Sequence, residues 1–114
     1  MKTASAKTKG RRLQQEVRDK ILDTYPDLEP DDVRSTSMGV SGEDVQLSPA
    51  ARKKFNYGVE CKSRATIMVY AWYQQAKRNT SVTAEPLLVI KQNHSKPLVV
   101  MDMEHFFSLM EKLK

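Results

Sequence analysis

Helix and strand patterns alternate along this chain, and their order limits the possible folds more than any other feature. Within residues 11–25, the apolar side chains Leu13, Val17 and Ile21 recur every four positions, which is the spacing of an amphipathic helix. Pro26 follows directly and favours an end to the helix at that point. The folded part of the chain is therefore expected to begin with a helix.

After this helix, short apolar or alternating runs predict five strands, at residues 33–38, 43–47, 56–62, 86–92 and 97–103. Ser48 and Pro49 fit the cap and first position of one helical turn between the second and third strands. Two more helices are expected, at residues 66–79 and 104–113. Because the order αβββαββα interleaves the two kinds of element, we expect an α/β sandwich with a central mixed sheet.

The length of 114 residues suits a single domain with one core. A lone cysteine cannot form an internal disulfide, so a reducing compartment is expected. No apolar run approaches the roughly 18 residues that a membrane span requires. We therefore expect a cytoplasmic protein that does not cross a membrane.

The net charge of +5 is concentrated near the N-terminus. Five basic residues and no acid lie within residues 1–12, and removing them leaves 14 basic against 14 acidic residues. We expect residues 1–10 to form a disordered basic arm that precedes the domain of residues 11–114. Such an arm suits nucleic acid, although a solubilising tail has the same composition.

The strand expected at residues 56–62 separates apolar from charged side chains. Side chains alternate between the two faces of a strand, so one face carries Tyr57, Val59 and Cys61, and the other carries Gly58, Glu60 and Lys62. Glu60 and Lys62 are either an exposed ion pair on an edge strand or part of a metal-dependent site. Gly58 on the same face would allow a ligand to approach the backbone closely.

A second carboxylate, that of Asp44, is expected on the polar face of the preceding strand. Asp44 faces away from the apolar side chains of its strand, whereas Glu43 shares their face. If this strand pairs with residues 56–62 as a hairpin, Asp44 and Glu60 converge beside Lys62. Paired carboxylates repel one another unless a cation lies between them, and oxygen ligands favour Mg²⁺ or Mn²⁺. An Asx-turn at Asp44 is the structural alternative.

A third carboxylate, Glu16, lies just off the apolar arc of the first helix. It can reach a cleft beside that arc, or it can be an ordinary solvated position. His94 and His105 are too far apart in the chain to indicate a zinc site.

The order of these residues resembles the PD-(D/E)xK nuclease superfamily, in which a helix glutamate is followed by a GxD-like turn and a (D/E)xK strand. Here these are Glu16, "GED" with Asp44, and "ECK" with Glu60 and Lys62. The segment "DVQLSPAARKKF…ECK", the "QA" after it and the "KQNHSK" turn are similar to small phage-type Holliday junction resolvase-like endonucleases. The likeness covers residues 11–113. Ser63, Arg64 and Tyr70 depart from the pattern, which leaves the substrate open.

The resemblance implies a three-layer restriction-endonuclease-like sandwich and Mg²⁺-dependent hydrolysis of DNA, with Mn²⁺ able to substitute. Asp44, Glu60 and Glu16 would bind the metal with the backbone carbonyl of Cys61, and Lys62 would assist catalysis. We expect DNA contacts from Arg11, Arg12, Arg52, Lys53, Lys54, Arg64, Gln75 and Lys91.

The helix at residues 66–79 is apolar almost all the way round. Trp72 and Tyr73 exceed what one buried face needs, which favours a homodimer. Two other functions remain open: a nicking or restriction-like nuclease of the same fold, and a non-catalytic DNA-binding module.

Overall fold

The computed structural model describes residues 5–37 and 42–114. Its order of elements confirms the expected αβββαββα arrangement, with the short α2 as the helical turn and a 3₁₀ turn, η1, in the acidic loop. The elements are α1 (Ala6–Thr24), η1 (Pro30–Asp32), β1 (Val33–Ser35), β2 (Val45–Leu47), α2 (Pro49–Lys54), β3 (Tyr57–Arg64), α3 (Val69–Asn79), β4 (Glu85–Gln92), β5 (Leu98–Val100) and α4 (Met103–Lys112). Of the turn expected between the first two strands, residues 39–41 lie outside the described residues, as does Met38.

The strands form a mixed sheet and a separate hairpin. In the order β3-β4-β5, β3 and β4 are parallel, and β4 and β5 are antiparallel. The hairpin expected between the second and third strands is not formed, because β2 pairs with β1 instead. Just before β2, the backbone N–H of Asp44 donates to the Val59 carbonyl of β3 at 2.9 Å.

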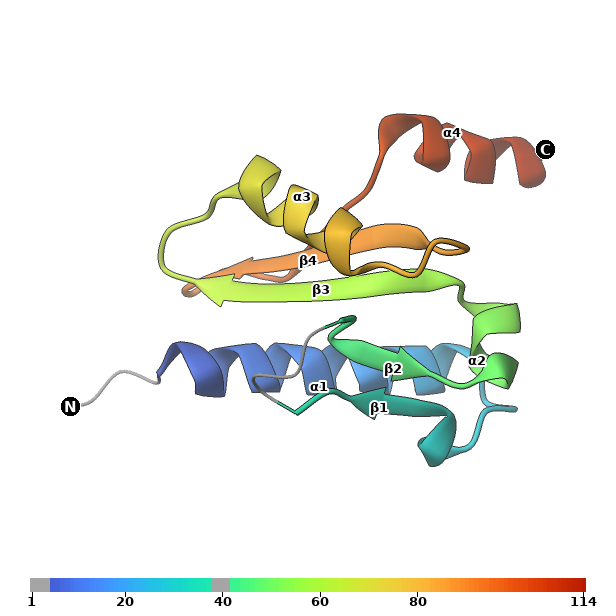
Figure 1. Cartoon of the computed structure of the whole chain (residues 1–114), viewed down its shortest axis with the longest axis horizontal. Coiled ribbons are helices and arrows are strands. Elements are labelled where there is room, and N and C mark those ends of the chain that lie inside the picture. Colours follow the sequence, from blue (N-terminus) through green and yellow to red (C-terminus); the bar gives the residue numbers. More distant parts are fainter. Residues whose placement is uncertain (1–4, 38–41) are drawn as a thin grey trace.

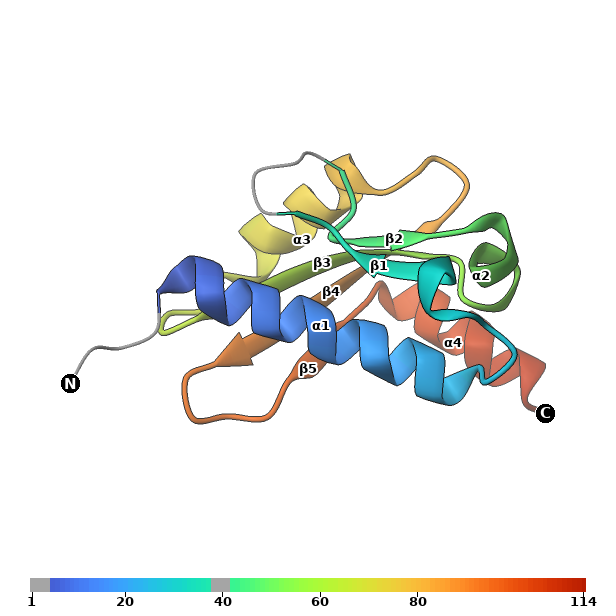
Figure 2. The same ribbon diagram turned by 90° about the horizontal axis from the view of Figure 1, so that it is seen from below.

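Helices cover both faces of the mixed sheet, with α1 on one side and α3 on the other (Figure 1). Figure 2, from below, shows α1 crossing the sheet. The buried part of β4 alternates between two cores: Leu87 and Val89 pack with α1, and Leu88 and Ile90 pack with Ala76 of α3. Because both faces are covered, this strand reads as a continuous apolar run.

α1 begins earlier than the sequence pattern indicated. Ser5 caps it, since its side chain accepts a hydrogen bond from the Thr8 N–H at 3.1 Å. Residues 6–10, assigned to a disordered arm, are therefore helical, and Gly10 is buried. The Lys9 ammonium also donates to the Asn93 side chain at 3.0 Å, which ties this turn to the loop after β4.

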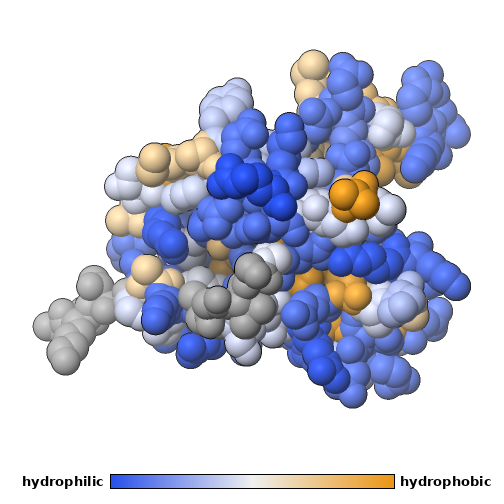
Figure 3. All heavy atoms as spheres, in the orientation of Figure 1, coloured by the Kyte–Doolittle hydropathy of each residue, from blue (hydrophilic) through white to orange (hydrophobic). Residues whose placement is uncertain are grey.

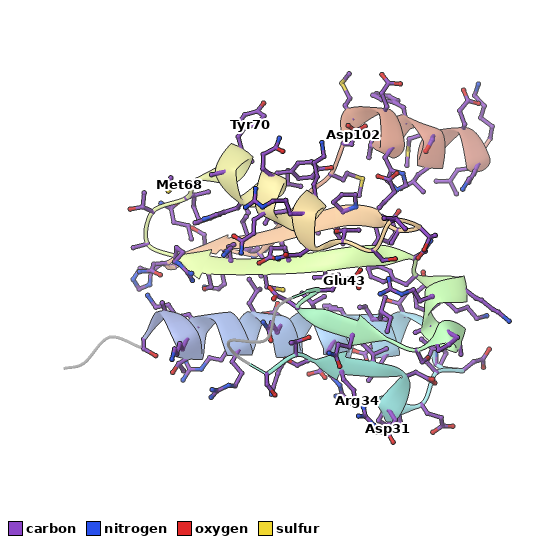
Figure 4. The ribbon with its side chains drawn as sticks, viewed as in Figure 1. Asp31, Arg34, Glu43, Met68, Tyr70 and Asp102 are labelled. Carbon is purple, nitrogen blue, oxygen red and sulfur yellow. The ribbon has the colours of Figure 1, made fainter. Side chains whose placement is uncertain are left out.

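The apolar residues of α3 are mostly used inside the chain. Trp72 and Tyr73 pack with Ile67 and Val69 against the core of Ala76, Leu88 and Ile90. Trp72 and Tyr73 therefore no longer indicate a homodimer. Tyr70 is the exception, since it is 85% exposed and points away from the sheet (Figure 4).

α4 projects from the end of the sheet and contains no buried residue (Figure 1). Asp102 caps it, accepting a hydrogen bond from the His105 N–H at 3.1 Å. The Tyr57 hydroxyl and the His105 imidazole, 2.6 Å apart, link the helix to β3. Figure 3 shows apolar surface beside charged side chains on this lobe, at the upper right. Among the described residues, no helix is long and apolar enough to span a membrane.

Candidate active site

A pocket of about 250 Å³ lies between the first turns of α1, the segment before β2 and the middle of β3. Its lining includes Gln14, Asp44, Glu60, Lys62, Arg64 and Gln75. The structure thus brings together the three residues on which the sequence prediction rested most, Asp44, Glu60 and Lys62, although the expected hairpin is absent.

The backbone of β3 holds Asp44. Its N–H donates to the Val59 carbonyl at 2.9 Å, and its side-chain Oδ2 accepts from the Cys61 N–H at 2.7 Å. These two bonds place the carboxylate over β3 as a strand neighbour would. Burial raises the pKa of Asp44, and this effect outweighs the hydrogen bond from Cys61 and the positive charge of Lys62.

Glu60 is the most buried acid of the site, at 4% exposure. Its Oε1 accepts a hydrogen bond from the Asn79 side chain at 3.1 Å, and its Oε2 lies 3.8 Å from the Lys62 ammonium. Burial, and then the negative charge of Asp44, raise the pKa of Glu60. The hydrogen bond from Asn79 and the charge of Lys62 oppose this rise without cancelling it. Glu60 and Lys62 do form an ion pair on an edge strand of the mixed sheet, but the pair is largely buried rather than exposed as the structural alternative required.

Asp44 and Glu60 line the same pocket, and the negative charge of Asp44 contributes to the raised pKa of Glu60. Two neighbouring carboxyl groups are stable when they share a proton or bind a cation. They repel each other when both are ionised and no cation is bound. No three His, Cys, Asp or Glu side chains converge anywhere in residues 5–37 and 42–114. Two carboxylates still fit Mg²⁺, which proteins commonly hold through one or two carboxylates, with water and substrate phosphate filling the remaining positions.

Glu16 does not belong to this site. It is exposed and lines a different groove, an apolar one of about 570 Å³ between α1 and β5. Gln14 lines the pocket instead: it is buried, accepts a hydrogen bond from the Ser35 hydroxyl at 2.7 Å, and acts to lower the pKa of Asp44. A signal was present in the sequence, because Gln14 lies three and seven residues before Val17 and Ile21, in the middle of the apolar arc.

Cys61 is a buried side chain of the α1 core, as its face of the strand predicted. Burial raises the pKa of its thiol well above the ordinary value, and the charges of Asp44 and Glu60 raise it further. The thiol therefore stays protonated and is a poor nucleophile.

The role expected for Gly58 is wrong. A Cβ added at this glycine would lie 2.3 Å from the hydroxyl oxygen of Thr80, so the space above the backbone is filled by the chain's own α3 end rather than open to a ligand. The glycine is needed for close packing between β3 and the residue that follows α3.

The residues expected to contact DNA separate into three groups. Arg64 and Gln75 line the pocket, together with Lys7, which the sequence reasoning did not select. Arg11, Arg12, Lys53 and Lys54 are exposed and Lys91 is half-buried, and none of these lines the pocket. Arg52 forms an ion pair with Glu43, so the run 52–54 does not form the mouth of the site as expected.

Three further residues near the carboxylates were missed by the sequence reasoning: Gln14, Asn79 and Lys7. No residue pattern marks Asn79, because its contact with Glu60 spans 19 residues. The chain matches no protein-family model, no curated protein and no solved structure.

Proposed function

We propose that this protein is a metal-dependent endonuclease that hydrolyses DNA phosphodiester bonds. One observation carries the proposal: the half-buried Asp44 and the buried Glu60, two carboxylates of raised pKa, share a small pocket with the ammonium group of Lys62. Raised pKa values in a concave site are typical of functional groups. The arrangement of α1, sheet and α3 in three layers is compatible with the restriction-endonuclease-like sandwich that the resemblance implies.

Asp44 and Glu60 would hold Mg²⁺, and Mn²⁺ would substitute for it. The bound ion would supply Lewis acidity toward a phosphate oxygen and a lowered pKa of bound water. Lys62, whose ammonium lies 3.8 Å from Glu60, would stabilise the negative charge that develops on the phosphate during hydrolysis. The Asn79 side chain keeps one oxygen of Glu60 occupied, which limits the orientations of this carboxylate.

Positive charge near the pocket supports a polyanionic substrate. Lys7 and Arg64 line the pocket from α1 and β3, and Arg11 and Arg12 are exposed on the adjoining turn of α1. Such residues bind backbone phosphates without reading bases. A preference for branched DNA, as in a Holliday junction resolvase, is the finer part of the proposal.

The test is a cleavage panel of four-way junction, flap, single-stranded and duplex DNA with Mg²⁺ or Mn²⁺. Asp44→Asn and Lys62→Ala should each lower the cleavage rate by about a hundredfold or more while leaving DNA binding largely intact. Lys112→Ala, which removes an exposed lysine of α4 outside the pocket, is the matched control and should cleave normally. Undiminished cleavage by either pocket variant would refute the proposed active site. Preference for linear duplex would favour a nicking or restriction-like enzyme.

A non-catalytic DNA-binding module is the second candidate, and Gln14 is the observation that favours it. A neutral amide occupies the helix position where the resemblance implies a carboxylate, which reduces the negative charge available to a metal. Salt-sensitive DNA binding without cleavage in either metal would establish this function instead.

The homodimer stays a prediction, now with a different surface. Met103, Phe106, Phe107, Met110 and Leu113 of α4 are between 38% and 78% exposed and recur at helical spacing. Symmetric cutting of two strands needs two sites, and a second copy would cover this apolar face. Sedimentation of wild type and Phe107→Ser tests it, because a monomeric wild type would refute the dimer.

A further inference from the structure

Glu43, the residue before Asp44, connects three separate segments of the fold. Its side chain is only 9% exposed. One carboxylate oxygen, Oε1, pairs with the guanidinium group of Arg52 on α2, and the other, Oε2, accepts a hydrogen bond from the Ser81 N–H at 2.9 Å. Its backbone carbonyl accepts from the Thr36 hydroxyl at 2.7 Å. Figure 4 shows Glu43 between β3 and the β1–β2 hairpin.

These contacts differ from those of a surface ion pair. Both oxygens of the Glu43 carboxylate are satisfied by donors fixed in the fold, which is the condition under which a buried charge is tolerated. The arrangement also carries a cost, because the Nη1 atom of Arg52 is buried without a hydrogen-bond partner among the described residues. Stability alone therefore does not account for the pair, since a fully solvated arginine would avoid that cost.

The segment after α3 reaches both halves of the carboxylate pair. Asn79 donates to Glu60 at 3.1 Å, and two residues later the Ser81 N–H donates to Glu43. Between them, Thr80 packs against Gly58 of β3. Residues 79–81 thus contact Glu60 directly, through the Asn79 side chain, and reach Asp44 through its neighbour Glu43.

We propose that Glu43 is a positioning residue that, with Arg52 and the Ser81 N–H, holds Asp44 against β3 at the correct place relative to Glu60. Asp44 lies just before β2, and its backbone makes two hydrogen bonds: its N–H donates to the Val59 carbonyl at 2.9 Å, and its carbonyl accepts from the Thr36 N–H at 2.8 Å. The Glu43 side chain adds a restraint that these backbone bonds do not provide, because it ties the same segment to α2 and to Ser81. The consequence for metal binding rests on the proposed function, whereas the restraint itself does not.

Amide hydrogen exchange of the metal-free protein tests the restraint. The Asp44 and Cys61 N–H groups report it, because the first donates to Val59 and the second donates to Asp44. In Glu43→Gln and in Arg52→Lys, both amides should exchange at least about tenfold faster, while the amide of Val89 in β4 is unchanged. Glu104→Gln, which removes an exposed acid on α4, is the control and should alter none of them.

Unchanged exchange at Asp44 and Cys61 would overturn the proposal. An equal increase in the exchange rate of the Val89 amide would also overturn the proposal, because Glu43 would then contribute only to the overall stability of the fold. Neither outcome depends on metal or DNA, so the positioning inference is decided even if the proposed nuclease function fails.

Mn²⁺ titration by calorimetry provides the second measurement. If wild type binds Mn²⁺, Glu43→Gln should weaken binding by about 10- to 100-fold, the usual effect of losing a residue that orients a ligand. Binding by Glu43→Gln at wild-type affinity would refute the inference. A wild type that binds no Mn²⁺ would refute the metal-dependent function instead, and the exchange data would still decide the restraint.

Discussion

Replacing Asp44 with asparagine should abolish cleavage and yet make the metal-free protein more stable at pH 8. The Cys61 N–H, which donates to Asp44 at 2.7 Å, keeps an acceptor in the amide oxygen of asparagine. The substitution removes a carboxylate that burial makes costly to ionise, and with it the negative charge that raises the pKa of Glu60. Functional groups of this kind commonly reduce stability in the absence of their ligand.

The expected increase in the free energy of unfolding of Asp44→Asn follows from the contacts that its side chain gains and loses. The asparagine NH₂ can donate to the Glu60 carboxylate, and a hydrogen bond to a charged group contributes about 1.5–3 kcal/mol. The attraction between Asp44 and Lys62 is lost at the same time, so the net gain should be lower, about 1 kcal/mol. For a domain of this size, that corresponds to a rise in Tm of about 4 °C.

The stability that Asp44→Asn gains over wild type should increase with pH. Because the folded-state pKa values of Asp44 and Glu60 are raised, wild type has its full contribution from these groups below their unfolded values of 3.8 and 4.5. That contribution is lost as the pH rises through the raised folded values. The advantage of Asp44→Asn should therefore be smallest near pH 4 and should grow toward pH 8.

Thermal melts in EDTA between pH 4 and pH 8 measure this difference. Asp32→Asn is a control of opposite sign, because hydrogen bonds from the Ser48 hydroxyl and the Glu29 N–H lower the pKa of Asp32. It should destabilise the protein at pH 8, with the deficit fading as the pH falls. Adding Mg²⁺ at 100 times its Kd should stabilise only wild type, by about 2.7 kcal/mol. A metal-free Asp44→Asn that is less stable than wild type at every pH would refute the reasoning.

Two other substitutions test the packing and the charge of the site. Gly58→Ala should lower the free energy of unfolding by about 1–3 kcal/mol, because its Cβ would lie 2.3 Å from the Thr80 hydroxyl; an unchanged midpoint in urea would contradict this close packing. Gln14→Glu should tighten Mn²⁺ binding and lower the metal-free melting temperature at pH 8, since it adds a third carboxylate beside Asp44 and Glu60. Calorimetry and thermal melts measure both effects, and weaker Mn²⁺ binding would argue against a cation between these groups.

The elements were largely predictable because their signals are local. Within residues 5–37 and 42–114, period-two and helical spacing located the five strands and the three longer helices, and Ser48 and Pro49 marked the start of α2. The start of α1 was missed because residues 6–10 carry no apolar repeat. Helix formation there depends on the cap at Ser5 and on burial of Gly10, and burial is a tertiary property.

The candidate site was predictable only in part. Strand alternation placed Glu60 and Lys62 on one face of their strand. It also predicted that Asp44 points away from the apolar face of its own strand, toward the same cleft. The helix contribution was misassigned because the choice between Glu16 and Gln14 depends on how α1 is rotated against β3. That rotation is set by packing of Leu13 and Ile21 on the sheet rather than by the helix itself.

The type and order of the elements and the facing of Asp44, Glu60 and Lys62 are encoded locally, because they follow from neighbours two to four residues apart. The pairing of β2 with β1 and the entry of Gln14 into the pocket depend instead on tertiary packing. Tertiary packing also decided that Thr80 fills the space above Gly58 and that Asn79, Ser81 and Arg52 secure Glu60 and Glu43. Strand pairing, helix rotation and loop position arise from packing between segments distant in sequence, and no local period encodes them.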